Sequence, residues 1–554
     1  MTKHFNSLGI FPSSLEHELV HALEDFSKND VLRRLWEHDY TLWSDSGNEI
    51  ENRLGWLHLH ETMLQKLPQI DMFVQQIQNR NFERVILLGM GGSILAPDVF
   101  QKIFGNKKGY PELMILDSTD PGAILNIESI LNLEKTLFIV ATKSGGTVET
   151  LSLFKYFYTL LSNQIGVENV GSHFVAITDP GSKLELLGKK LHFREIFSND
   201  PNIGGRYSAL SFFGLVPAAL IGIDTQRLLE EAKRGALDNN AYKKPQNSLA
   251  AVLGCFLGVA AQKGKDKLTL ISDEAISSFS DWIEQLVAES TGKSGRGILP
   301  VVGEEIAEDL SFYGLDRIFI FHQFNETKRL DDLAKKLQKV GHPVVQFRIE
   351  NKYQLGGLML TWEIATSLAG HIMNIHPFNQ PNVESAKILA NQSVQSFKEK
   401  GQLPDTSASS LTLTTINDFF SDVQKGDYIN IQAYVTPTLQ SEKAFRVLQA
   451  ILRNKYKVAV TFGFGPRFLH STGQLHKGDA GRGFFLQFVS TTFKDLDIPT
   501  QAGTSESFIS FDILKKAQAL GDAKALIQAN RRLVTFSLQE PINQTIIDLA
   551  SRIK

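Results

Sequence analysis

The feature that most constrains the fold is an apolar run ending in closely spaced glycines, Glu83-Arg-Val-Ile-Leu-Leu-Gly-Met-Gly-Gly-Ser93. In a parallel sheet such a strand ends at the carboxyl edge, where glycines let a ligand approach the backbone. The helix that follows offers N–H groups and the positive end of its dipole, which suit a phosphate. Because many doubly wound proteins contain such a loop, a structural turn is the alternative at this point.

The order strand, loop, helix is repeated along the chain. Apolar runs typical of buried strands lie at 85–88, 113–116, 137–140 and 174–177, and they return at 268–271, 317–321 and 344–349. Such alternation predicts parallel sheets with helices on both faces. We therefore expect an α/β protein with two doubly wound units in tandem, over residues 81–235 and 236–400.

Two further regions flank these units. Residues 1–80 show helical periodicity without a strand run, and they predict a helical N-terminal region. The polar stretch 404–410 is typical of a linker. Residues 411–554 then contain strand-like runs at 428–435, 458–462 and 484–488 and end in helical sequence, so we expect a third α/β segment there.

Composition narrows the classes of function. Lys and Arg (57) nearly balance Asp and Glu (60), so no bulk attraction to nucleic acid or to an anionic membrane is expected. The single cysteine, Cys255, excludes disulfides within the chain and Cys-rich metal sites, and its apolar run, 249–261, is too short to span a membrane. Residues 1–7 lack a signal-peptide pattern, so a cytoplasmic location is expected.

A second loop strengthens the phosphate prediction. The run 137–140 precedes Thr142-Lys-Ser-Gly-Gly-Thr-Val-Glu-Thr150, which has four hydroxyls and a lysine around a glycine pair. Thr142, Ser144 and Thr147 can direct hydroxyls into one turn at the start of the next helix. A helix cap made by Thr147 and Thr150 is the alternative, although a cap does not require so many hydroxyls.

Charged and polar residues further along suit acid–base chemistry on an anion. Arg206 follows two glycines. One interpretation is that it stabilises an anion, and the alternative is that it lies exposed at a turn. Gln285 and Glu289 lie four residues apart, on one face of a helix that ends near Gly292. Negative charge at a helix C-terminus opposes the dipole, which raises the carboxyl pKa and suits a general base; a solvated glutamate is the alternative.

In chain order these segments resemble the motifs of the phosphoglucose isomerase family: Gly89–Ser93, Thr142–Thr150, Gly204–Ser208, Gln285–Lys293 and Pro377–Lys387. The resemblance covers about residues 50–395, and the stretch Phe462–Gly478 is similar to the isomerase half of transaldolase/phosphoglucose isomerase fusion proteins. No transaldolase barrel fits, because it takes about 250 residues. The resemblance implies tandem sugar-isomerase (SIS) domains. It also implies reversible isomerisation of glucose 6-phosphate and fructose 6-phosphate through a cis-enediol, in glycolysis and gluconeogenesis, without a cofactor or metal.

The resemblance also assigns roles to matched residues. Glu289 moves a proton between C2 and C1, Arg206 stabilises the enediolate and Lys387 acts at the ring oxygen or hydroxyls. The remaining matched positions bind the sugar phosphate: Gly92, Ser93, Thr142, Lys143, Ser144, Thr147, Gly205, Gln285 and Gln380. A homodimer is implied by family alone. Acceptance of mannose 6-phosphate stays open, as does a regulator that binds sugar phosphates without catalysis.

Several positions depart from the family pattern. Thr142 replaces a usual serine, Gly146 a common threonine and Asn382 a usual glycine. The family's ring-opening histidine, commonly contributed by a neighbouring subunit, has no clear counterpart; His322 and His342 lie in the right region without the motif. Our hypothesis for a substitute is His476, and the alternative is that His476 is a surface loop histidine.

Overall fold

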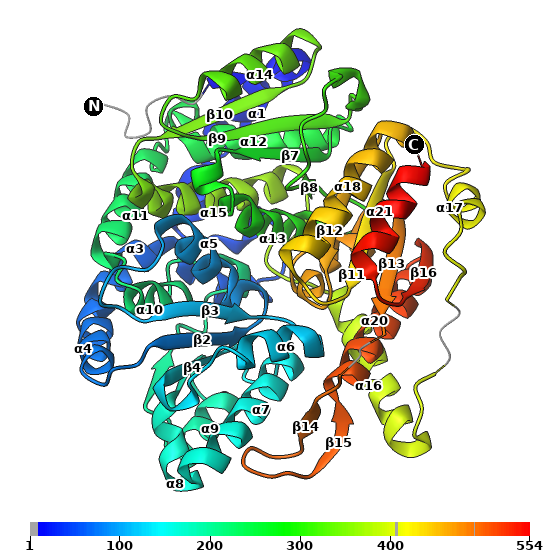
Figure 1. The fold of residues 1–554 in the computed structure, drawn as a ribbon. Helices are drawn as coiled ribbons and strands as arrows, with labels where there is room; N and C mark the ends of the chain where they lie inside the picture. Colours follow the sequence, from blue (N-terminus) through cyan, green and yellow to red (C-terminus); the bar gives the residue numbers. More distant parts are fainter. Residues whose placement is uncertain (1–8, 405–407, 492–493, 554) are drawn as a thin grey trace.

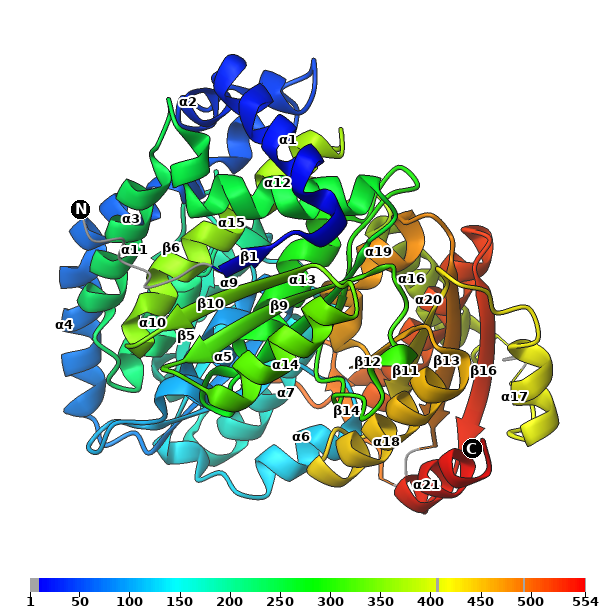
Figure 2. The same cartoon turned by 90° about the horizontal axis from the view of Figure 1, so that it is seen from above.

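The computed structural model describes residues 9–404, 408–491 and 494–553 of the 554-residue chain. Three mostly parallel sheets, each flanked by helices, confirm the predicted α/β class (Figures 1 and 2). In Figure 1 the second sheet, whose strands lie at residues 9–11 and 267–349, is above the first sheet, whose strands lie between residues 84 and 198. The third sheet, with strands between residues 428 and 538, is to the right of both. The first residues, which lack a signal-peptide pattern, and residues 405–407 of the predicted linker lie outside the described part.

The first sheet has five parallel strands in the order β3-β2-β4-β5-β6. Val85 and Leu87 of β2 pack into one core while Ile86 and Leu88 pack into another, which explains the continuous apolar run. The strands are β2 (Arg84–Gly89), β3 (Glu112–Leu116), β4 (Thr136–Ala141), β5 (Phe174–Thr178) and β6 (Glu195–Ser198). Its helices are α5 (Leu95–Phe104), α6 (Pro121–Glu128), α7 (Val148–Ile165), α8 (Val167–Val170), α9 (Lys183–Lys190) and α10 (Phe212–Leu220). Because β2 and β4 are neighbours, the two predicted phosphate loops leave the sheet at the same edge.

The second sheet has the order β1-β10-β9-β7-β8, with β1 (Gly9–Phe11) antiparallel to β10. The prediction of an N-terminal region without strands is therefore wrong at β1, because three residues are too few to show alternation. The other strands are β7 (Lys267–Ser272), β8 (Leu299–Val301), β9 (Arg317–Phe324) and β10 (Val344–Ile349). The helices are α11 (Thr225–Asn239), α12 (Leu249–Gln262), α13 (Phe279–Thr291), α14 (Lys328–Lys339) and α15 (Leu355–Ile372). The next helix, α16 (Val383–Lys400), packs against α20 (Phe511–Gln528) of the C-terminal part instead (Figure 1). The boundary predicted at 235/236 falls within α11, so a division there cuts a continuous helix.

The third sheet is parallel, in the order β12-β11-β13-β16, and a hairpin of β14 and β15 lies apart from it. Its strands are β11 (Tyr428–Tyr434), β12 (Ala459–Phe464), β13 (Gly483–Ser490) and β16 (Arg532–Leu538), and the hairpin strands are β14 (Asp497–Pro499) and β15 (Ser507–Ser510). The helices are α17 (Leu413–Phe419), α18 (Leu439–Tyr456), α19 (Gly473–Gly478), α20 (Phe511–Gln528) and α21 (Ile542–Ile553). The predicted helical end of the chain thus contains a strand, β16, between two helices.

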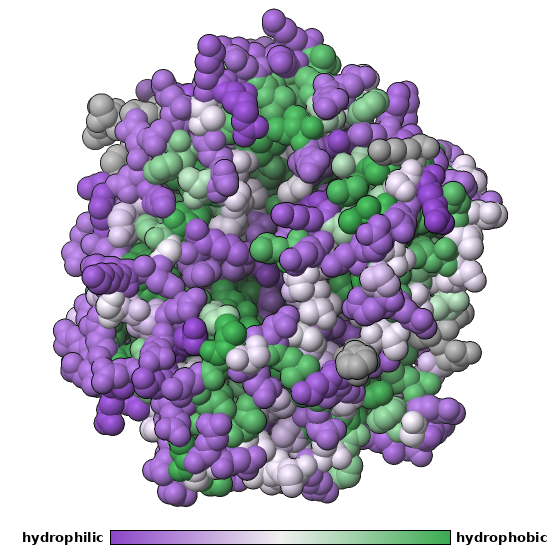
Figure 3. Space-filling view, viewed as in Figure 1, coloured by the Kyte–Doolittle hydropathy of each residue, from purple (hydrophilic) through white to green (hydrophobic). Residues whose placement is uncertain are grey.

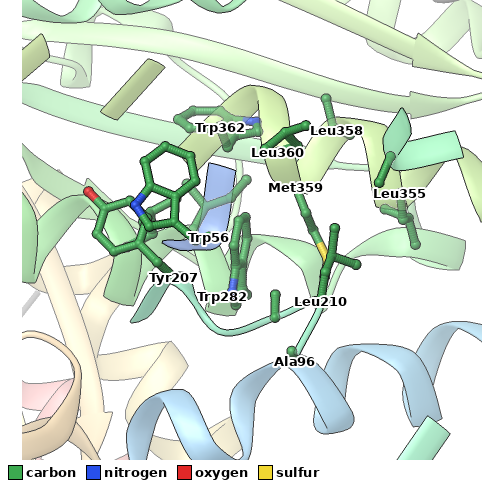
Figure 4. Close-up of a cluster of buried hydrophobic side chains, with 14 of the residues drawn as sticks. Trp56, Ala96, Tyr207, Leu210, Trp282, Leu355, Leu358, Met359, Leu360 and Trp362 are labelled. Atoms are coloured by element: carbon green, nitrogen blue, oxygen red, sulfur yellow. The ribbon is translucent and has the colours of Figure 1, made fainter. Parts of the chain in front are cut away.

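The N-terminal helices support the first two sheets through one buried core. They are α1 (Glu16–Lys28), α2 (Val31–Trp36), α3 (Leu59–Thr62) and α4 (Leu67–Gln78). Trp56 stacks on Tyr207 with ring centroids 4.9 Å apart, and Trp282 and Trp362 lie in the same cluster (Figure 4). Because Tyr207 follows Arg206 directly in the chain, this packing holds the loop that carries Arg206 in place.

The surface gives no sign of a membrane-spanning element among the described residues. No helix there is long and apolar enough to cross a bilayer. Figure 3 shows hydrophilic residues over most of one face, with small apolar patches and a hollow near its centre.

Candidate active site

Two glycine loops meet at the carboxyl edge of the first sheet. They form short 3-10 turns, Gly91–Ser93 after β2 and Gly205–Tyr207 before α10. A Cβ built on Gly92 would lie 2.1 Å from the Gly205 carbonyl oxygen, so only glycine permits this approach. At Gly205 itself a Cβ would meet nothing within 4 Å, which leaves open space beside the backbone. Ser93, a predicted contact, is buried in the first of these turns.

The hydroxyl-rich loop lies at the start of α7, an 18-residue helix. Thr147 occupies the N-cap position but makes no side-chain cap bond; its hydroxyl lies 2.8 Å from the Thr142 hydroxyl instead. The alternative of a Thr147 cap is therefore wrong. Ser144 Oγ accepts from the Gly146 N–H at 3.3 Å. Three hydroxyls thus gather at a helix N-terminus that no side chain caps, an arrangement that suits an anion.

Lys143 is oriented differently from these hydroxyls. Its ammonium donates to the Asp179 carboxylate and, at 2.9 Å, to the Pro201 carbonyl oxygen. The side chain is therefore held by neighbouring loops, and an anion at the N-terminus of α7 would meet the hydroxyls and backbone rather than this ammonium.

Arg206 and Glu289 form a buried ion pair at the centre of the site. Arg206 Nη1 lies 3.2 Å from Glu289 Oε2, and the two residues are only 4% and 6% exposed. The alternatives of an exposed arginine and a solvated glutamate are both wrong. The rest of the guanidinium is satisfied by groups on two segments: Ser290 Oγ (2.9 Å), Gln380 Oε1 (3.3 Å), Pro377 O (2.7 Å) and Asn379 O (3.0 Å).

Burial raises the pKa of Glu289 above its ordinary value, although Arg206 and then His470 act in the opposite direction. A carboxylate that is costly to ionise is a stronger base, and the arginine holds it in place. Gln285, one turn earlier on α13, extends its Nε2 to within 3.5 Å of Glu289 Oε2. Its Oε1 is buried and has no hydrogen-bond partner in the described residues, so an acceptor is available to a ligand.

Gln380 and Lys387 lie at the outer side of the ion pair. Gln380 is exposed and contacts Arg206 from the loop after α15. Lys387, on α16, has a half-exposed side chain with its ammonium 3.9 Å from Glu384, and its charge lowers the pKa of Glu149. The structure thus brings both residues to the same region as Arg206 and the N-terminus of α7.

His476 does not belong to this site, and the hypothesis that it opens the sugar ring is wrong. It lies on α19, fully buried against Phe468 and Phe485, and neither ring nitrogen has a hydrogen-bond partner in the described chain. Burial lowers its pKa well below the ordinary value. It is not a surface loop histidine either. His322 and His342 are also buried in the second unit, where burial lowers their pKa values to about 3 and about 4.

Sequence reasoning missed two residues that the structure places at the site, Glu149 and His470. Glu149 Oε1 lies 2.8 Å from His470 Nε2, and the His470 carbonyl oxygen accepts from Gln285 Nε2 at 2.8 Å. Both residues fall within stretches noted above, Thr142–Thr150 and Phe462–Gly478. The available signal was an ionisable side chain inside each motif, at a position where neither the helix nor the turn requires one.

The fold and site together define a sugar-phosphate isomerase class built on doubly wound SIS-type sheets. In structure the chain is similar to a hypothetical protein from Thermus thermophilus (TM-score 0.59, 24% identity), with 70% of this chain and 99% of that one covered. It is also similar to a glucose-6-phosphate isomerase from Chlamydia trachomatis (TM-score 0.53, 19% identity, 67% and 78% covered).

Sequence comparison identifies the family within this class of sugar-phosphate isomerases. The sequence model of phosphoglucose isomerase matches residues 58–297. The glucose-6-phosphate isomerase of Prochlorococcus marinus is 30% identical over 410 residues, which cover 66% of this chain and 77% of that protein. The enzyme of that name from Campylobacter jejuni is 28% identical over 379 residues, covering 61% and 91%. The chain belongs to the phosphoglucose isomerase family.

Proposed function

We propose that this protein interconverts glucose 6-phosphate and fructose 6-phosphate through a cis-enediol, in glycolysis and gluconeogenesis. The observation that carries the proposal is the buried pair of Glu289 and Arg206, set between a hydroxyl-rich helix N-terminus and two glycine loops. Family membership adds independent support, because the relatives named above bear the name of this activity.

The proposed chemistry is a proton transfer at carbon. Glu289 takes the proton from C2 of the open-chain aldose, and the electron pair of that bond forms C1=C2 while negative charge develops on O1. Arg206 stabilises this charge, which is the kind of preorganised electrostatic effect that contributes most to many enzymes. The proton of the O2 hydroxyl then passes to O1, which leaves the negative charge on O2. Glu289 returns its proton to C1, where the electron pair of C1=C2 takes it, while an electron pair on O2 forms C2=O2, so that protons and electrons balance.

The substrate contacts follow from the same geometry. Thr142, Ser144 and Thr147, with the N-terminus of α7, receive the phosphate. Around the sugar lie Gly92, Ser93, Gly205, Gln285, Gln380 and Lys387. The proposal includes a helical region at 1–80 and units at 81–235, 236–400 and 411–554, with α11 continuous across the boundary between the first two units. It also includes a cytoplasmic location and a homodimer as the family's common assembly.

A Glu289→Gln variant tests the proposal. We expect loss of isomerisation in a coupled assay of fructose 6-phosphate conversion, and equal loss of deuterium exchange at C2. The matched control is Glu274→Gln, an exposed glutamate in the turn before α13, which keeps full activity. We expect the wild-type rate to be unchanged in excess EDTA, since Arg206 supplies the positive charge.

Three results would count against the proposal. A folded wild-type protein that binds fructose 6-phosphate without turnover would favour a sugar-phosphate-binding regulator. A Glu289→Gln variant with wild-type exchange at C2 would remove Glu289 as the base. Loss of activity in EDTA, restored by a divalent metal, would require a different source of carbonyl polarisation.

A further inference from the structure

The short helix α19 of the C-terminal segment, residues 411–553, lies directly against the end of α13, the helix that carries Glu289. A Cβ built on Gly292 would lie 2.3 Å from Leu475 Cα, and a Cβ built on Gly478 would lie 2.2 Å from the Gly292 carbonyl oxygen. Only glycine permits such an approach at either position. The backbones of the two helices therefore touch just after the proposed base.

Gln474, which is fully buried on α19, joins two helix ends through one amide. Its Nε2 donates to the Gly292 carbonyl oxygen at 2.9 Å and to Asn382 Oδ1 at 2.8 Å, and its Oε1 accepts from the Asn382 N–H at 2.9 Å. Gly292 is the C-cap residue of α13, and Asn382 is the N-cap residue of α16. The amide thus satisfies backbone groups that each helix leaves unpaired at its end.

Both helix ends belong to the candidate site. Glu289 lies in the last turn of α13. The segment before Asn382 supplies Gln380 and two backbone carbonyl oxygens to Arg206. Lys387 follows within the first turns of α16. A shift of one helix end relative to the other would therefore change the distances between the proposed base, the arginine beside it and Lys387.

Gln474 is a fixed reference point because its own helix is held firmly within the C-terminal segment. Lys477 Nζ donates to Asp522 Oδ1 of α20 at 2.5 Å, and these two side chains are 2% and 0% exposed. The Arg531 guanidinium donates to the carbonyl oxygens of His476 and Lys477 at 2.9 Å each. Because breaking a buried ion pair is costly, α19 has little freedom to move on α20.

The same helix, α20, also supports α16. A Cβ built on Gly521 would lie 2.6 Å from the Ala390 backbone nitrogen and 2.8 Å from the Ala386 carbonyl oxygen, so the two helices touch at their backbones beside Lys387. α20 therefore holds the helix that carries Lys387 directly, and it holds Gln474 through α19.

We propose that Gln474 is a positioning residue that sets the spacing between the end of α13 and the start of α16, so that the C-terminal segment fixes the geometry of the active site. The inference rests on the proposed isomerase function. It also accounts for Asn382, which stands where the family usually has glycine, because Asn382 Oδ1 is an acceptor for Gln474 that a glycine lacks.

A Gln474→Met variant nearly keeps the volume of the side chain and removes its three hydrogen bonds. We expect a folded protein whose kcat for fructose 6-phosphate falls about tenfold or more, because small misplacements of catalytic groups are costly. Competitive inhibition by inorganic phosphate, which needs only the hydroxyl-rich turn at the start of α7, should keep its wild-type inhibition constant. The matched control is Gln395→Met, an exposed glutamine on α16 that keeps both quantities.

Two results would overturn the role of Gln474. One is a folded Gln474→Met protein with the wild-type kcat. The other is an equal loss of kcat and of phosphate inhibition, which would indicate a general structural role. A wild-type protein that binds fructose 6-phosphate without converting it would overturn the proposed function and this inference with it, whereas an active wild type with an unaltered variant overturns the inference alone.

Asn382→Gly covers the case in which Gln474→Met does not fold, because glycine is tolerated at an N-cap position. This change removes one of the three hydrogen bonds, and we expect kcat to fall at least about twofold with phosphate inhibition unchanged. A wild-type kcat in Asn382→Gly would count against the inference. Where both variants fold, the double variant should be no slower than Gln474→Met; a loss equal to the product of the two single losses would show that the residues act independently and would overturn the pairing.

Discussion

Replacing Arg206 by lysine keeps the positive charge and removes the directed hydrogen-bond donors of the guanidinium. The guanidinium makes five hydrogen bonds, to Glu289, Ser290, Gln380 and two backbone carbonyls, whereas a lysine ammonium has three donors. Gln380 is exposed and can bond to water, so three donors for the other four acceptors leave at least one of these without a partner. Such a group costs about 1–3 kcal/mol, so Arg206→Lys should lower the free energy of unfolding by about that amount.

The same change should act on catalysis. Losing one preorganised donor to a developing oxyanion lowers kcat by about 10²–10³-fold, and we expect a fall of that size in the coupled assay. Urea unfolding followed by tryptophan fluorescence measures the stability term separately. The control is Arg33→Lys, which exchanges a largely exposed ion pair for another and should change neither quantity.

The reasoning would be refuted by an Arg206→Lys protein with wild-type kcat and stability. That result would mean that positive charge alone, without the directed donors, holds Glu289 and stabilises the enediolate. A loss of stability without a loss of kcat would restrict Arg206 to a structural role.

Two further predictions concern a glycine contact and a buried acid. Gly92→Ala should reduce kcat/KM at least tenfold, because the added methyl group would force the Gly205 backbone away, whereas Gly205→Ala should fold normally and weaken substrate binding. Steady-state kinetics and circular dichroism distinguish the two variants. A fully active Gly92→Ala protein would contradict the close approach of the two glycine loops. Burial and then Asp281 raise the pKa of Glu284 to about 8 from an ordinary value of 4.5. The folded state therefore binds more protons than the unfolded state between these values, and its stability falls as pH rises through them, by at most about 1.4 kcal/mol per pH unit. Urea midpoints across this range should show that slope in the wild type and lose it in Glu284→Gln; an unchanged slope would show that another group is responsible.

The strands that could be predicted from sequence share a physical property. Those with continuous apolar runs, such as β2, β4 and β9, are buried along nearly their whole length. The strands of the three sheets that were not predicted are β1, β6, β8 and β16, and each lies at a sheet edge. An edge strand is short or half-exposed, so its composition resembles a loop. The pattern of one sequence therefore identifies the centre of a sheet better than its limits.

The candidate site divides in a similar way. Gln285 and Glu289 were grouped correctly because helical spacing alone puts them on one face. The family resemblance gave Arg206 and Glu289 separate roles at one site, but it did not predict their ion pair, and no spacing rule relates residues 83 positions apart. His470 was passed over for His476, six positions later, because only the docked structure shows that α19 turns His476 inward. Which of two nearby histidines faces a site depends on tertiary packing that local pattern does not encode.

The contact between Glu149 and His470 joins residues 321 positions apart in sequence. A ribosome therefore finishes both SIS-type units, and the C-terminal segment as far as His470, before this contact can form. Closing so long a loop is slow compared with local folding, so it belongs to the last steps of maturation. Nascent chains that end before residue 470 thus hold both glycine loops and the hydroxyl-rich turn without the Glu149–His470 contact that joins them to the C-terminal segment.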